Sequence, residues 1–115
     1  MSDCSQIFLM QILANENNDY TEALRIAKYL NEKHPTNPYF KRYYMRYLYS
    51  TRKYRELNPI ANEVLSNVEA GQFGYEYTSG RWASFFLGQM HQAYRNFDQA
   101  KKFYESAIRY GDLGE

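Results

Sequence analysis

The chain has 115 residues, of which 44% are hydrophobic and 18% aromatic, and this is enough apolar material for one small folded domain rather than a disordered chain. Fourteen basic and thirteen acidic residues give a formal net charge of +1, which provides no global attraction to nucleic acid or to a membrane surface. The single cysteine, Cys4, excludes an internal disulfide and is compatible with the cytoplasm or the bacterial periplasm. No apolar run reaches the roughly 18 residues of a membrane span.

Apolar residues recur at three- and four-residue spacing along the chain, and no window alternates as a strand would. The pattern predicts helices near 4–16, 19–33, 37–50, 53–69, 79–94 and 97–110. Asp19 and Asn96 each stand three residues before a Glu or Gln, the spacing of a capping box, and both are predicted N-caps. Asn37, which precedes Pro38, is a third predicted N-cap.

Proline inside the fourth predicted helix has two interpretations. Pro59 removes a backbone hydrogen bond and collides with the preceding turn, so it would kink a helix that began near Lys53. Alternatively, Asn58 is the N-cap of a shorter helix, with Pro59 in its first turn and residues 53–57 as a separate turn.

The six predicted helices form three hairpins that repeat in sequence. The second helix of each hairpin opens with an aromatic residue, at Tyr20, Tyr54 and Phe97, at intervals of 34 and 43 residues. The nine surplus residues fall in the segment 71–80, GQFGYEYTSG. Equivalent positions of the three units align at the same two intervals, and each of the following triplets is one such position: Ala23, Leu57, Ala100; Ala27, Ala61, Tyr104; Leu30, Val64, Ala107; Met10, Tyr44, Leu87; Gln11, Met45, Gly88; and Ala14, Leu48, His91.

A repeat of 34 residues with this pattern resembles the tetratricopeptide repeat, whose signature is W-x2-L-G-x2-Y followed by A-x3-F. The third unit is the best copy, because it has the L-G pair, His91 at the tyrosine position, and an A-x3-aromatic pattern before a last small residue. Its matching residues are Leu87, Gly88, His91, Phe97, Ala100, Tyr104 and Ala107. The first unit keeps Tyr20, Ala23 and Pro35, and the second keeps little beyond Tyr54 and Ala61.

The resemblance implies an all-α fold of three antiparallel helix-turn-helix repeats stacked in a right-handed superhelix. The units would be 4–37, 38–71 and 81–114, in a single domain with an insertion at 72–80. Small residues at the repeat columns would let helices approach closely, and Tyr20, Tyr54 and Phe97 would fill the wedge between them. In particular, a side chain on Gly88 would collide with the helix that carries Phe103 and Tyr104.

Arrays of this kind usually end in a solvating helix with a polar outer face. This sequence ends at GDLGE without one, so we expect either a fragment of a longer chain or a partner, including a second copy, over the last helix. The function implied by the resemblance is a scaffold for binding a protein or peptide.

No motif for catalysis is present. His34 and His91 lie 57 residues apart, one before a proline and one at a packing position of the repeat. There is no metal-ligand spacing, no phosphate-binding glycine loop and no nucleophile motif. The sequence therefore predicts neither an enzyme nor a cofactor or metal site.

The segment 39–55, YFKRYYMRYLYSTRKYR, combines six basic residues with six tyrosines and no acid. In tetratricopeptide domains the first helices line a concave groove, and the resemblance carries its contact positions onto the second and third units. With Tyr43, which lies in the same segment, the predicted partner-binding residues are Tyr39, Arg42, Tyr43, Arg46, Tyr49, Trp82, Phe85, Gln89 and Gln92. Ser5, Phe8, Ile12 and Asn15 hold the same groove positions in the first unit.

Arg42 and Arg46 are four residues apart, so they share one helix face and could clamp a carboxylate or phosphate. A protein or peptide carrying carboxylates is one predicted partner. Single-stranded nucleic acid, whose bases stack on aromatic rings, is the alternative. A third interpretation is that the stripe is a solvated helix face and the tyrosines pack between helices.

The insertion contains three aromatic residues, Phe73, Tyr75 and Tyr77, among glycines. It is predicted either to fold back and shield an apolar edge or to form a partner-binding loop.

Overall fold

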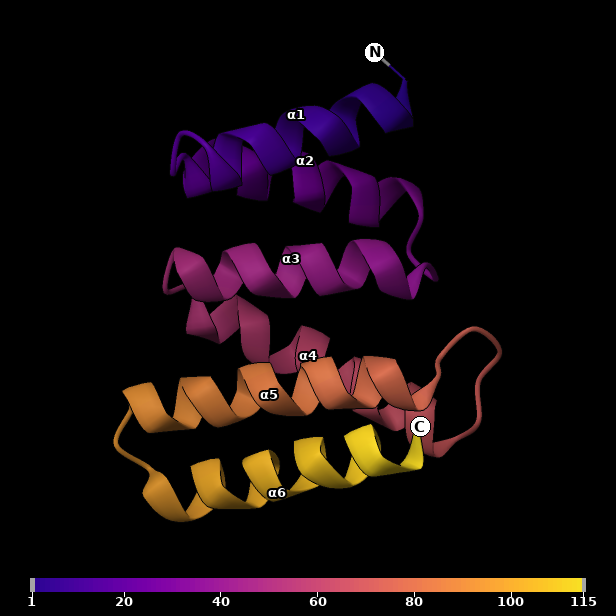
Figure 1. Cartoon of the computed structure of the whole chain (residues 1–115), viewed down its shortest axis with the longest axis vertical. Helices are drawn as coiled ribbons and strands as arrows, with labels where there is room; N and C mark the ends of the chain where they lie inside the picture. Colours follow the sequence, from indigo (N-terminus) through magenta and orange to yellow (C-terminus); the bar gives the residue numbers. More distant parts are fainter. Residues whose placement is uncertain (1, 115) are drawn as a thin grey trace. The chain divides into compact units, whose positions relative to one another are not determined.

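The computed structural model describes residues 2–114, and this part of the chain is helical without strands (Figure 1). The helices are α1 (Asp3–Asn15), α2 (Tyr20–Lys33), α3 (Pro38–Ser50), α4 (Tyr54–Glu69), α5 (Tyr77–Ala93) and α6 (Phe97–Leu113). The all-helical prediction is confirmed, and every predicted helix is present. The chain divides into two compact units, Met1–Lys53 and Tyr54–Glu115, each described by itself below.

Helix starts follow the predicted caps, with one difference. The Asp19 carboxylate accepts a hydrogen bond from the backbone N–H of Glu22 at 3.2 Å, and the Asn37 side chain accepts one from the N–H of Tyr39 at 2.9 Å. Asn96 is the N-cap of α6, but its side chain makes no capping hydrogen bond. The predicted capping box at Asn96 is therefore wrong in its side-chain contact and right in its position.

The turns that follow α1, α3 and α5 share a backbone conformation. Asn18, Arg52 and Arg95 are the non-glycine residues with positive φ in the described chain, at 54°, 59° and 60°. This left-handed conformation is unfavourable for residues with a side chain. The three positions are separated by 34 and 43 residues, which are the intervals of the sequence repeat.

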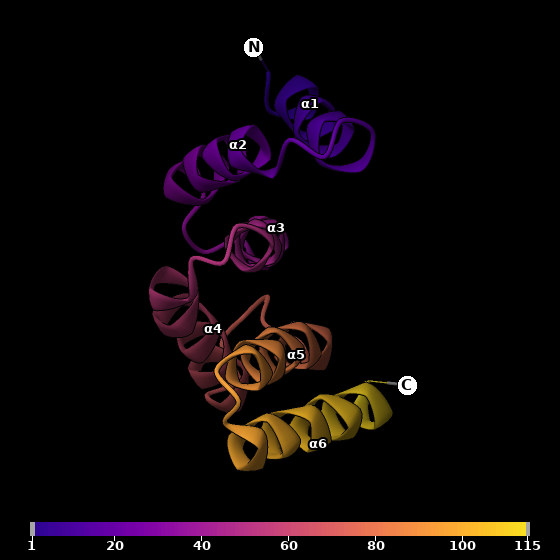
Figure 2. The same cartoon turned by 90° about the vertical axis from the view of Figure 1, so that its left-hand side faces the viewer.

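The N-terminal unit packs α1 against α2 and α2 against α3. Figure 2 shows α1 and α3 on the same side of α2. Helix α2 has an apolar stripe at three- and four-residue spacing, and all four of its residues are buried: Ala23, Ile26, Ala27 and Leu30. From α1, Met10 and Ala14 are buried against this core, whereas Ile7, Leu9 and Leu13 are half-buried.

The C-terminal unit packs α5 between α4 and α6. On α5, Gly80 and Gly88 face two tyrosine rings of α6. A Cβ atom on Gly88 would lie 2.7 Å from ring carbons of Tyr104, and one on Gly80 would lie 3.1 Å from ring carbons of Tyr110. The predicted close approach at Gly88 is confirmed.

One packing prediction for this unit is wrong. Phe97 was expected to fill a wedge between helices, but its side chain is 61% exposed at the start of α6. The aromatic columns at Tyr20 and Tyr54 are half-buried. The physical reason is position, since in the described part of this unit α6 packs on α5 alone.

Pro59 lies inside α4, which runs without interruption from Tyr54 to Glu69. The shorter helix capped by Asn58 is therefore excluded. Pro59 is exposed, and it occupies the sixth position of the helix, so the one helical hydrogen bond it removes is near the N-terminal end.

The insertion is partly helical, because α5 begins at Tyr77 rather than near residue 79. In the remaining loop, Gly71 and Gly74 have φ of 67° and 86°, which glycine adopts without strain. Tyr75 is buried at 7% exposure, whereas Phe73 is 96% exposed. One aromatic residue of the loop thus folds back onto the unit and another projects from it.

Candidate partner-binding surfaces

The predicted binding residues fall into two sets, one in each unit. Five are on α3: Tyr39, Arg42, Tyr43, Arg46 and Tyr49. Four are on α5: Trp82, Phe85, Gln89 and Gln92. Each set is described below within its own unit, and their assembly into one groove stays a prediction.

Tyr39, Tyr43 and Tyr47 form a row of rings along α3. Their spacing of four residues places them on one helix face. The ring centroids of Tyr39 and Tyr43 are 5.0 Å apart in an edge arrangement, and those of Tyr43 and Tyr47 are 6.1 Å apart. Tyr39 is 44% exposed and Tyr47 is 1% exposed. The row therefore runs from solvent into the core, where Tyr47 meets Tyr20 of α2 at 6.5 Å.

The hydroxyl oxygen of Tyr43 accepts two hydrogen bonds. Gln11 of α1 donates from Nε2 at 3.1 Å, and the hydroxyl of Tyr39 donates at the long distance of 3.4 Å. Gln11 stands where the repeat signature has glycine, and here its amide connects α1 to α3.

The pKa values of these tyrosines diverge. Desolvation raises the pKa of Tyr43, but hydrogen bonds from Tyr39 and Gln11 and the positive charges of Arg42 and Arg46 outweigh it, so the net pKa is below 10.0. Tyr39 has its pKa raised to about 12, first because its hydroxyl donates to Tyr43 and second because of desolvation. Burial is the main reason that the pKa of Tyr47 is raised. Tyr43 is thus the phenol of this row that loses its proton first.

Arg42 and Arg46 lie beside the tyrosine row. Arg46 is exposed and Arg42 is half-buried. Both guanidinium groups act electrostatically on Tyr43. Helix α3 itself contains no acidic residue.

The basic segment 39–55 is less uniform than its sequence indicates. Lys41 is 3% exposed and Tyr44 is 7% exposed, so both belong to the interior and not to a binding face. Arg52 and Lys53 are in the turn after α3, and Arg55 is in α4, in the other unit. The stripe that remains on α3 is Tyr39, Arg42, Tyr43 and Arg46, with Tyr49 half-buried at its end.

Helix α1 adds apolar residues in the same unit. Phe8 is 65% exposed and Ile12 is 50% exposed, and Gln11, which binds Tyr43, lies between them in sequence. The groove positions Ser5 and Asn15 are exposed as well. The surface of the N-terminal unit therefore combines a basic tyrosine stripe with exposed apolar side chains.

In the C-terminal unit, Trp82 and Phe85 line a pocket of about 490 Å³ between α5 and α6. Their ring centroids are 6.1 Å apart, and the Arg81 guanidinium carbon lies 5.8 Å from the centroid of the Trp82 ring. The pocket is also lined by α6 residues that lie outside the predicted set: Ala107, Ile108, Gly111 and Asp112. The 66% exposure of Ile108 could have been anticipated only from knowledge of which face of α6 is covered.

Gln89 and Gln92 complete the predicted set on α5. Gln89 is half-buried. Gln92 accepts a hydrogen bond from the Tyr104 hydroxyl at 2.6 Å, so its side chain holds the ring that covers Gly88. Gln92 therefore has a structural contact in addition to its predicted binding position.

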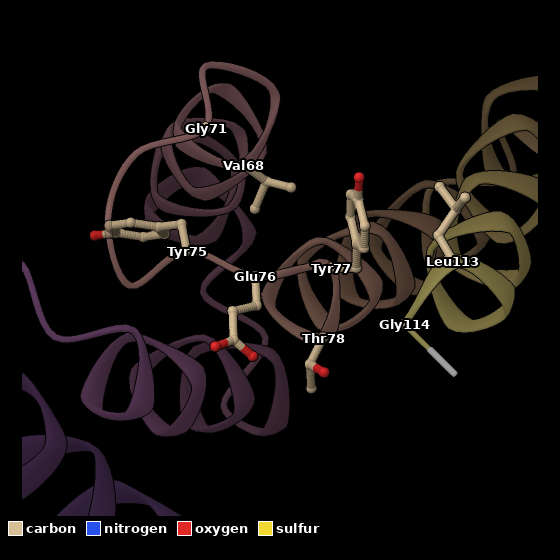
Figure 3. A pocket seen from close by; sticks show the side chains of 8 residues that line it. All are labelled: Val68, Gly71, Tyr75, Glu76, Tyr77, Thr78, Leu113 and Gly114. Atoms are coloured by element: carbon tan, nitrogen blue, oxygen red, sulfur yellow. The ribbon is translucent and has the colours of Figure 1, made fainter.

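A second pocket of the same unit, about 400 Å³, lies where the 70–76 loop meets α5 and the end of α6 (Figure 3). Tyr77 and Leu113 border it, with Val68 on the α4 side and Glu76 at its edge. None of these residues belongs to the predicted binding set.

The histidines make structural contacts. The ring of His91 stacks on Phe103 at 5.4 Å, and His34 lies 2.9 Å from the Asp3 carboxylate.

Within residues 2–114, no cluster of three His, Cys, Asp or Glu side chains is arranged to hold a metal ion. Likewise, none of the described helices combines the length and apolar character needed to cross a membrane.

The chain was compared with known proteins in three ways. No family model matches it, and neither a search of curated protein sequences nor a search of solved structures finds a match. The resemblance to the tetratricopeptide repeat therefore depends on the residues and contacts described above.

Proposed function

We propose that this chain is a tetratricopeptide-like scaffold that binds an acidic segment of a partner protein or peptide. The observation that carries the proposal is the α3 stripe, where Tyr39, Arg42, Tyr43 and Arg46 share a surface in a helix without acids. The spacing of the helices and turns supports the proposal of a tetratricopeptide-like fold, since the left-handed turn residues recur at the intervals of the sequence repeat.

The chemistry of the stripe favours an anionic partner. Arginine binds carboxylates through two parallel N–H donors, and tyrosine supplies a large rigid contact with little loss of side-chain entropy. Both residue types are enriched where binding energy concentrates at interfaces. The exposed ring of Tyr39 and the exposed guanidinium of Arg46 are available for such contacts.

The neighbouring apolar side chains favour a peptide over a free anion. Phe8 and Ile12 expose apolar area on the same unit, and a peptide with acidic and apolar side chains would contact both surfaces. Solvent-exposed charge pairs alone contribute little, so apolar contact is needed for a stable complex.

A peptide-display selection on the folded chain tests this proposal. We expect enrichment of acidic peptides, whose affinity is then measured by fluorescence anisotropy. The double substitution Arg42→Gln and Arg46→Gln should weaken binding by about tenfold or more, equivalent to about 1.4 kcal/mol. The matched control is Lys28→Gln with Lys102→Gln, which removes the same net charge from exposed positions on other helices.

If both double variants weaken peptide binding equally, binding depends on the net charge of the chain and not on a specific site. Failure to enrich any peptide would contradict the proposal. Circular dichroism melts of each variant confirm that the fold is retained, because Arg42 is half-buried.

The exposed Tyr39 ring beside Arg46 also favours a second candidate, single-stranded nucleic acid. Binding of an oligothymidine would then fall steeply between about 50 and 200 mM salt. Loss of two phosphate contacts in the Arg42 and Arg46 variant would reduce the magnitude of the log–log salt slope by about 1.4. No binding at low salt would exclude this candidate.

A further inference from the structure

The phenol oxygen of Tyr43 accepts hydrogen bonds from two side chains. Gln11 Nε2 donates to it from α1 at 3.1 Å, and the Tyr39 hydroxyl donates to it from the preceding turn of α3 at 3.4 Å. Two donors directed at one phenol oxygen occupy both of its acceptor positions. Hydrogen bonds that donate to the charged form of a group favour that form, so this arrangement stabilises the phenolate.

The charges around Tyr43 act in the same direction. Arg42 and Arg46 lie on α3 and lower the pKa of Tyr43, and the phenols of Tyr39 and Tyr47 are its neighbours on the same helix face. Helix α1 contributes the neutral amide of Gln11, and α2 contributes Tyr20, which contacts Tyr47. Desolvation opposes ionisation, but the net effect lowers the pKa of Tyr43.

We propose that Tyr43 is a covalent modification site, at which electrophiles that react with a phenolate oxygen attach ahead of the more exposed Tyr94 and Tyr29, because Gln11, Tyr39, Arg42 and Arg46 together stabilise its anion. Tyr43 is half-buried, whereas Tyr94 is 61% exposed and Tyr29 is 48% exposed. Selectivity based on exposure alone would favour Tyr94. Selectivity based on the hydrogen-bonded anion favours Tyr43.

The reaction with a neutral sulfonyl fluoride illustrates the chemistry. The Tyr43 proton passes to water or buffer, and the phenolate oxygen attacks the sulfur atom. An S–O bond forms, the S–F bond breaks and fluoride leaves. The nearby guanidinium groups do not take part in bond making, and their positive charge lowers the cost of the anion that attacks.

Benzenesulfonyl fluoride is the probe, used on the full chain from about pH 7 to above the ordinary tyrosine pKa of 10.0. Peptide mass spectrometry gives the rate of adduct formation at each tyrosine. We expect the Tyr43 adduct to form faster than the Tyr94 adduct at neutral pH, and the Tyr43 rate to reach half its maximum below pH 10.0. Each unit by which a pKa falls raises the phenolate fraction about tenfold at lower pH.

Three substitutions test the cause. Gln11→Met removes one donor at similar size, Tyr39→Phe removes the other, and Arg46→Gln removes one charge. Each should move the Tyr43 rate midpoint to higher pH while the Tyr94 profile stays in place. Gln92→Met is the matched control, because this amide contacts Tyr104 in the other unit and should leave Tyr43 unchanged.

Ultraviolet absorbance of ionised tyrosine provides a second readout without any reagent. Tyr43→Phe should reduce the absorbance change that the folded chain shows below pH 10.0. Equal or faster labelling of Tyr94 at every pH would overturn the proposal. An unchanged Tyr43 midpoint in all three variants would also overturn it.

Discussion

The ring of Tyr104 lies directly over Gly88, so that a Cβ atom on Gly88 would be 2.7 Å from Cδ1 and Cε1 of Tyr104. The Tyr104 hydroxyl donates to Gln92, one turn further along α5, and this bond holds the ring in place. Glycine in a helix costs roughly 0.5–1 kcal/mol relative to alanine. Here the close packing of an aromatic ring on the bare backbone offsets that cost.

Gly88→Leu is expected to lower the free energy of unfolding by about 1–3 kcal/mol through overpacking. Gly88→Ala should be less harmful. Gly111→Ala is the control, because its Cβ would meet only Arg81 Cδ at an ordinary 3.6 Å, and it should stabilise by about 0.5–1 kcal/mol. Urea denaturation followed by circular dichroism measures all three. A neutral Gly88→Leu would contradict the packing of α5 on α6.

The two predicted capping boxes make different contacts and should respond differently to truncation. Asp19→Ala removes the hydrogen bond to the N–H of Glu22 and should cost about 1 kcal/mol. Asn96→Ala removes no such bond and should cost clearly less. Thermal melts of the two variants compare them directly, and equal losses would show that the Asp19 bond contributes nothing in solution.

Arg95 occupies the turn between α5 and α6 with φ of 60°. The left-handed conformation costs about 1–2 kcal/mol for a residue with a side chain, which exceeds the entropy that glycine adds to the unfolded chain. Arg95→Gly should therefore stabilise by about 0.5 kcal/mol. Arg109→Gly, inside α6, should instead destabilise by about 1 kcal/mol. Chemical denaturation of both variants tests the opposite signs.

Tyr47 links stability to alkaline pH. Burial raises its pKa above 10.0, although the charge of Arg46 partly opposes this. Because the pKa of Tyr47 is higher in the folded state than in the unfolded state, the contribution of Tyr47 to stability is complete below pH 10. That contribution is lost as the pH rises through the folded-state pKa. Tyr47→Phe should therefore lose less stability than the wild type above pH 10. Urea midpoints at neutral and alkaline pH give the comparison, and parallel losses in both proteins would contradict it.

The 70–76 loop carries two aromatic residues of opposite exposure. Tyr75→Ala should destabilise by about 2–4 kcal/mol, because it removes a buried ring. Phe73→Ala should change stability by less than about 0.5 kcal/mol, since its ring is 96% exposed. Scanning calorimetry separates the two. A large effect of Phe73→Ala would mean that the loop shields the unit with both rings.

Much of the local structure could be predicted before any coordinates. The helices at 20–33, 38–50 and 54–69 begin and end within one residue of their predicted ranges, because caps, prolines and apolar spacing act over a few residues. Gly88 was assigned a packing contact from its place in the repeat, and its neighbour is Tyr104. The predicted range of the last helix ends at residue 110, whereas α6 continues to Leu113.

The sequence by itself determined the helical class and the turn positions, since each depends on residues close together in the chain. Only the tertiary structure decided that Lys41 and Tyr44 are buried, that Phe97 is exposed and that Gln11 reaches Tyr43. Which face of a helix meets a neighbour depends on contacts between residues far apart in sequence. For that reason the basic tyrosine segment 39–55 could be located from the sequence, whereas the hydrogen bond that Tyr43 accepts from Gln11 could not be predicted.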